Sequence, residues 1–284
     1  MKYVLILLFS TTLLSQSYAQ NWCKKRKPAH FEEPAGTFED KLVSDRFNHT
    51  ITPLIVKFKY TQVEFSTVLR NEIVENGEWA NDPNDYTFNY YNNLLIKHSF
   101  NEKLEFHICY TDFLLKGDSS IRDLSRTSRN TAISFGTKYC IYQSPHNKIR
   151  LSLFGQLTIP KPRYTLNTFL TPEIRFLFLQ PVGKHMNITY NLGGAFSPVT
   201  EHLFLLYGIN PKIEITKRIE VFGEFFKSFT KTGAPRVPIK RGLFGFGFYI
   251  LENLYFYSSF EAGWYHEESL NSERFDLGLA FRFL

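Results

Sequence analysis

The chain has 284 residues, with 33 Lys and Arg against 27 Asp and Glu, so its formal net charge is +6. Its mean hydropathy is negative, at -0.23, yet 17% of its residues are aromatic, including 29 Phe and 16 Tyr. A soluble core of this size needs far fewer rings, whereas a surface that alternates between lipid and water is both aromatic-rich and polar on average. The composition therefore argues against a soluble globular domain.

Residues 1–19 have the order of a secretory signal peptide. Lys2 precedes an apolar run from Tyr3 to Phe9, and small and polar residues end at Ala19. This order predicts cleavage after Ala19. Trp22 stands immediately before Cys23, where a lipoprotein needs a small residue, so lipidation is not expected. No later window approaches 18 uncharged apolar residues, and no helix is expected to cross a membrane.

Residues 20–60 show little periodicity and contain the basic run Lys24-Lys25-Arg26-Lys27, followed by Pro28 and Pro34. Basic runs are usually solvated. We expect this segment to be either a periplasmic N-terminal arm or a piece that enters the lumen of a barrel. The sequence leaves both alternatives open.

Two-residue alternation recurs from Gln62 to the end of the chain. In the last strand Phe275, Leu277 and Leu279 share one face, while Asp276 and its small neighbours occupy the other. The pattern predicts an all-β fold for residues 61–284, a 12-stranded antiparallel up-and-down transmembrane β-barrel in the outer membrane of a Gram-negative bacterium. The strands are expected near 62–70, 87–98, 104–114, 131–142, 149–159, 169–180, 186–196, 203–215, 219–229, 242–251, 254–264 and 273–283.

The connections between these strands predict the orientation of the barrel. Each odd-numbered connection is longer than its even-numbered neighbours, and the short ones are turn-forming clusters such as Asn101-Glu102-Lys103 and Pro181-Val182-Gly183-Lys184. Barrels of this kind have short periplasmic turns and longer outer loops. Both chain ends are therefore expected in the periplasm.

Inward-facing charged residues of both signs are predicted to line the pore. They permit two interpretations, a polar selective passage or a closed core in which acids and bases neutralise one another. The sequence does not decide between these. The set consists of Glu64, Glu105, His107, Lys138, Arg150, Glu173, Arg175, Glu220, Glu224, Glu261, Asp276 and Arg282.

Basic residues in two expected exterior loops predict a contact with lipopolysaccharide. Each could meet lipid phosphates through charge-assisted hydrogen bonds, although solvated loop charge is the alternative. The expected partners are outer-membrane lipid and lipopolysaccharide, and no nucleic acid, which a secreted chain rarely meets. The residues are Lys116, Arg122, Arg126, Arg129, Lys231, Arg236, Lys240 and Arg241.

Nothing in the sequence predicts catalysis, a cofactor or a metal site. A lipid esterase would need His and Ser together on the outer rim. The close pair His98-Ser99 falls at a periplasmic turn instead. The glycines in the strand near 242–251 are expected to ease close packing, not to hold phosphate. Cys109 and Cys140 are expected to be isolated thiols in preference to a disulfide.

Short motifs along the chain resemble a family of outer-membrane proteins, the MetA-pathway of phenol degradation family of transporters. The resemblance covers most of the chain from about Val43 onward, and it departs from the family pattern at Phe47 and Leu284. It implies a barrel and suggests transport, with aromatic compounds as solutes, and it implies no catalytic residues. The matching stretches are Ser44-Asp45-Arg46-Phe47, Gln62-Val63-Glu64-Phe65, Leu95 to Glu105, Gly136-Thr137-Lys138-Tyr139, Leu157-Thr158-Ile159-Pro160 and Phe281-Arg282-Phe283.

Two function classes follow. The leading one is a channel or transporter for small solutes. The alternative is a structural or accessory outer-membrane barrel that docks a protein partner through its N-terminal arm or its loops.

Overall fold

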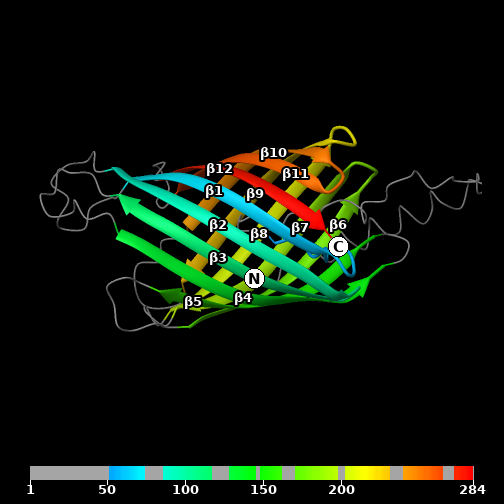
Figure 1. Ribbon diagram of the computed structural model, residues 1–284, viewed down its shortest axis with the longest axis horizontal. Helices are drawn as coiled ribbons and strands as arrows, with labels where there is room; N and C mark the ends of the chain where they lie inside the picture. Colours follow the sequence, from blue (N-terminus) through cyan, green and yellow to red (C-terminus); the bar gives the residue numbers. More distant parts are fainter. Residues whose placement is uncertain are drawn as a thin grey trace, which may run out of the picture. The chain divides into compact units, whose positions relative to one another are not determined.

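The computed structural model describes residues 51–73, 86–116, 128–144, 148–161, 170–197, 202–230, 239–264 and 272–283. Its twelve strands pair antiparallel with their neighbours in the chain, and β1 pairs with β12 to close a barrel (Figure 1). The predicted fold class is confirmed, and all twelve predicted strands are present. They are β1 (Thr61–Ile73), β2 (Tyr86–Asn101), β3 (Leu104–Lys116), β4 (Ser128–Gln143), β5 (Arg150–Lys161), β6 (Thr171–Val182), β7 (Met186–Ser197), β8 (His202–Glu214), β9 (Ile219–Thr230), β10 (Ile239–Leu251), β11 (Leu254–Trp264) and β12 (Ser272–Phe283).

Side chains alternate between the two faces of the wall, as β12 illustrates. Phe275 and Leu279 expose 40% and 44% of their surface on the outer face, whereas Asp276 and Ala280 are 1% and 0% exposed on the inner face. Most of the exposed large hydrophobic residues of the described strands lie at outward positions. The barrel therefore presents an apolar belt to its surroundings. Within the described ranges, no helix is long and apolar enough to span a bilayer.

The two ends of the barrel differ in their connections. We call the end that contains residues 102–103, 144–149, 183–185, 215–218 and 252–253 the turn end; β1 begins and β12 finishes there. The opposite loop end contains connections 74–85, 117–127, 162–170, 198–201, 231–238 and 265–271. The expected alternation of long and short connections holds except for 198–201, which has the same length as 215–218. Which end faces the periplasm stays a prediction.

Aromatic rings from three inward positions lie flat against glycines of the adjacent strands. A Cβ built on Gly245 would collide with the ring of Phe222, and one on Gly247 would collide with Tyr255. Gly278 accommodates Tyr257 in the same way. These glycines serve close packing, as expected for the glycine-containing strand near 242–251. The rings bury their surface against the inner wall of β9–β12.

Candidate functional site

Residues 51–60, which we call the lumen segment, precede β1, and residues 51–56 lie against the inner face of the barrel. The segment begins with a reciprocal contact. Ile51 donates its backbone N–H to Asn191 Oδ1 at 2.9 Å, and Asn191 Nδ2 donates to the Ile51 carbonyl at 2.8 Å. Asn191 is an inward residue of β7 and is buried. Its amide thus satisfies both backbone groups of Ile51, as a neighbouring strand would.

Three further inward side chains hold the next residues of the lumen segment. Ser152 Oγ on β5 donates to the Pro53 carbonyl at 2.8 Å. Lys138 Nζ on β4 donates to the Leu54 carbonyl at 3.1 Å. The backbone N–H of Val56 donates to the Glu105 carboxylate on β3. The described part of the segment is therefore pinned by side chains from four strands.

The order of these contacts gives the path of the lumen segment. Ile51 contacts β7, the following residues contact β5, β4 and β3 in turn, and Tyr60 leads into β1. In a closed barrel of twelve strands, β7 lies opposite β1. The segment consequently crosses from one side of the lumen to the other while it follows the β3–β7 wall. These four hydrogen-bonding side chains belong to the β3–β7 wall, whereas Arg282 of β12 lies over the Tyr60 ring.

Glu105 is the centre of the polar cluster beneath the lumen segment. Its Oε1 lies 3.2 Å from Lys138 Nζ and 2.5 Å from His107 Nε2. The side chains of Glu105 and Lys138 are 0% exposed. A buried ion pair offsets its desolvation cost only when hydrogen bonds satisfy the remaining groups. The Val56 N–H and the Leu54 carbonyl supply such bonds here.

A second buried pair lies beside the first on β1 and β2. Lys97 Nζ is paired with the Glu64 carboxylate, and neither side chain exposes more than 1% of its surface. Gln62 Nε2 donates to Glu64 Oε1 at 2.8 Å. The turn-end half of the β1–β4 wall is thus filled by paired charges.

On the opposite wall, Glu220 of β9 gathers three partners. Lys212 Nζ lies 2.5 Å from its Oε2, and the hydroxyl of Tyr255 donates to its Oε1 at 2.5 Å. Tyr249 donates to Oε2 at 3.4 Å. The carboxylate ties β8, β9, β10 and β11 together on the inside.

The loop-end half of the lumen carries arginine pairs. Arg274 contacts Asp276 at 2.6 Å and Glu261 at 3.7 Å, and Arg241 contacts Glu261 at 3.2 Å. The side chain of Arg241 is 13% exposed, compared with 0% for Lys138. On β6, Arg175 Nε lies 2.5 Å from Glu173 Oε1. Partly exposed charges therefore occur at both ends of the lumen, since the Lys212 side chain, near the turn end, is 24% exposed.

The predicted pore-lining residues occupy inward positions. Nine of the twelve are buried, while Arg150, Glu173 and Arg282 are partly exposed. Arg282 lies over the Tyr60 ring, with its Cζ 5.2 Å from the ring centroid. Their role in a passage stays a prediction. The inward set missed four cations that share the same alternation and complete the pairs; these are Lys97, Lys212, Arg241 and Arg274.

The expected lipopolysaccharide residues need correction. Lys240 and Arg241 lie within β10, not in an exterior loop, and the Arg241 side chain points inward to Glu261. The error arose because Ile239-Lys240-Arg241 carries no apolar alternation to mark the start of the strand. Lys116 and Arg129 likewise lie within strands and not in the loop, as the last residue of β3 and the second residue of β4. The other four, Arg122, Arg126, Lys231 and Arg236, fall outside the described residues.

The close His98-Ser99 pair named in the sequence is divided between the two faces of the wall. His98 and Ser99 are consecutive in β2, so their side chains point to opposite faces; Ser99 Oγ donates to the Asn101 carbonyl at 2.6 Å. No group of three or more potential His, Cys, Asp or Glu metal ligands occurs within the described ranges. Cys109 and Cys140 are free thiols. Cys109 pairs in register with Ser134, which places Cys140 roughly 20 Å further along β4.

Comparisons with known proteins agree on the fold. The structure is similar to the COG4313 outer-membrane channel from Pseudomonas putida F1, with a TM-score of 0.62 over 85% of this chain and 100% of that chain at 9% sequence identity. It is also similar to the NanC porin, with a TM-score of 0.54 over 77% of this chain and 98% of that chain at 7% identity. No protein-family model and no curated protein matches the chain by sequence, so the resemblance to the MetA-pathway family stays a prediction. The chain has the fold of outer-membrane channel and porin barrels.

Proposed function

We propose that this chain is an outer-membrane β-barrel channel for small solutes, that it catalyses no reaction, and that its turn end faces the periplasm. The observation that carries the proposal is the charged interior. Replacing buried ion pairs by well-packed apolar residues often leaves stability unchanged or raises it, so a barrel selected for stability alone has no need of such pairs. Fixed charges along a lumen are one of the features that give a passage its selectivity.

In the proposed mechanism the lumen segment closes the turn end. It is bound to the barrel by separate hydrogen bonds from Asn191, Ser152, Lys138 and Glu105. Each such bond contributes about 1 kcal/mol net, more where a charged group takes part. A solute would pass between the segment and the β8–β12 wall when some of these bonds open.

The charges set the class of solute only broadly. Acids and bases alternate through the lumen, and low-dielectric walls strengthen their fields. We therefore expect discrimination by charge and by size, with small solutes admitted. The family resemblance suggests aromatic compounds as solutes, so the transport assay includes them.

The test is conductance of the full-length protein in planar bilayers, with liposome swelling in small sugars and aromatic acids. The double variant Asn191→Leu and Ser152→Ala removes three of the hydrogen bonds that pin the lumen segment. We expect small, discrete openings for the wild type and larger or more frequent openings for the variant. Asn187→Leu is the matched control, because Asn187 is a buried inward amide on the same strand as Asn191.

A wild type and a released variant that are both silent in bilayers and impermeable in vesicles would contradict the channel proposal. That outcome, together with stoichiometric copurification of a protein partner, would favour the accessory role instead.

A further inference from the structure

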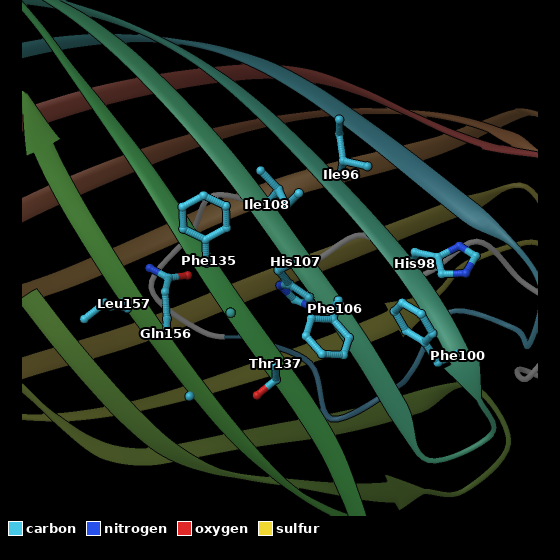
Figure 2. A pocket seen from close by; sticks show the side chains of 12 residues that line it. Ile96, His98, Phe100, Phe106, His107, Ile108, Phe135, Thr137, Gln156 and Leu157 are labelled. Atoms are coloured by element: carbon cyan, nitrogen blue, oxygen red, sulfur yellow. The ribbon is translucent and has the colours of Figure 1, made fainter.

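A hollow of about 680 Å³, which we call the outer groove, interrupts the apolar belt over β2–β5. Figure 2 shows the side chains of Phe100, Phe106, Ile108 and Phe135 that project from neighbouring strands around it. Ile96 and Leu157 complete its apolar wall. The groove is therefore lined by the same residue types as the rest of the belt.

The outer groove exists because its floor lacks side chains. Gly155 is an outward position of β5 where a built Cβ would meet no atom within 4 Å, whereas a Cβ on Gly136, an inward position of β4, would approach the Phe154 ring at 3.3 Å. The strands beneath remain paired, with Gly136 opposite Gln156 and Thr137 opposite Gly155. The wall is consequently closed at this point. The groove is bordered mostly by outward side chains, and the inward residues His107 and Gln156 also line it.

The turn end of the outer groove is bordered by rings and then by positive charge. The rings of Phe100 and Phe106 meet edge to face at 5.0 Å, and His98 packs on Phe100 at 4.9 Å. Beyond them Lys103 is exposed in the β2–β3 turn. Lys59 is exposed next to Tyr60, whose carbonyl accepts a hydrogen bond from the Ser99 N–H. The carboxylate of Glu102, also exposed in that turn, leaves an excess of positive charge.

The other described residues of the turn end also carry an excess of positive charge. Its exposed cations are Lys148, Lys184, Lys217 and Arg218, against the exposed carboxylate of Glu252. Basic side chains just outside an aromatic and apolar belt lie where lipid phosphates lie in a bilayer. An acyl chain can follow an irregular apolar groove, whereas rigid side chains need a matched shape.

We propose that the outer groove, with Lys103 and Lys59 at its turn end, binds an anionic glycerophospholipid, one acyl chain lying in the groove and the phosphate meeting the two lysines. The proposal rests on the proposed function in that it places the turn end at the phospholipid leaflet. A second copy of this chain fits less well. A two-fold contact across the groove brings each Lys103 towards its counterpart, so like charges meet.

The experiment is native mass spectrometry of the full-length protein in detergent, with phosphatidylglycerol or phosphatidylcholine added. We expect the wild type to retain phosphatidylglycerol ~30-fold better, because each of the two Lys near a lipid surface contributes about 1 kcal/mol. Lys59→Gln with Lys103→Gln should abolish this preference. Gly155→Leu should reduce retention of both lipids, since the new side chain fills the groove. Heat-dependent gel migration verifies that each variant is folded.

Two controls match these changes on the far side of the barrel. Lys217→Gln with Arg218→Gln removes the same charge from the β8–β9 turn, and Phe244→Trp adds bulk to the outer face of β10. Both should bind as the wild type does. The proposal would be overturned if the wild type retained the two lipids equally, or if Gly155→Leu retained them as well as the wild type does. It would also be overturned if the protein formed lipid-free dimers that Gly155→Leu disrupts. Binding in detergent needs neither conductance nor a known orientation, so failure of the channel proposal would be seen separately.

Discussion

Glu105 Oε1 and Lys138 Nζ lie 3.2 Å apart across β3 and β4, and neither side chain has any exposed surface. Both also bind the lumen segment, through the Val56 N–H and the Leu54 carbonyl. The pair therefore couples the stability of the wall to the position of the segment.

The first prediction follows from that coupling. Lys138→Met leaves the Glu105 carboxylate buried without its main cation, and should lower the free energy of unfolding by about 3–5 kcal/mol. The double variant Glu105→Leu and Lys138→Met should recover most of this loss, because neither charge then remains unpaired. Urea titrations of protein reconstituted in vesicles measure both. A double variant as unstable as the single one would contradict the argument.

A second prediction concerns the packing of rings on glycines. Gly247→Ala forces Tyr255 away from the wall and from Glu220, and should cost about 1–3 kcal/mol. Gly155→Ala is the matched control, because its Cβ enters open space and should change stability by less than about 0.5 kcal/mol. The temperature at which gel migration changes reports the difference. Equal effects of the two substitutions would exclude the packing explanation.

Ion selectivity gives a third prediction. Arg274 neutralises Glu261 and Asp276 in the loop-end half of the lumen, and Arg175 neutralises Glu173. Arg274→Gln, alone or with Arg175→Gln, should shift the reversal potential towards cation selectivity, since carboxylates then dominate the field. Leu192→Val, on the outer face of β7, should leave it unchanged. A reversal potential that does not move would show that ions bypass this cluster.

Orientation is tested by thiol labelling of whole cells. Cys placed at Ser125, in the connection between β3 and β4, should react with an impermeant reagent, and Cys at Lys184, in the β6–β7 turn, should not. Both belong in a background that lacks the native cysteines. The reverse pattern would mean that the turn end faces outward, and the periplasmic placement of the chain ends would then be wrong.

Strand positions could be predicted from the sequence because apolar and polar residues alternate within each strand. Facing directions followed for the same reason, and they brought Glu105, Lys138 and His107 to one inner surface. The hydrogen bonds between Ile51 and Asn191 could not be predicted. They join residues 140 positions apart, and on the Ile51 side they use backbone groups, which every residue has. The pairing of Arg241 with Glu261 needed the inter-strand register, which alternation alone does not supply.

The path of the lumen segment also bears on how the barrel assembles. Tyr60 passes directly into β1, the strand whose pairing with β12 closes the cylinder. A chain inserted hairpin by hairpin would reach that seam last, when β12 arrives. Residues 51–56 must then already rest on β3, β4, β5 and β7, or be drawn in afterwards through the mouth at the turn end. The lumen segment is synthesised before the strands of the barrel, yet it continues into β1, which pairs with β12, the strand synthesised last. Correct packing of the interior therefore depends on the order in which the strands join.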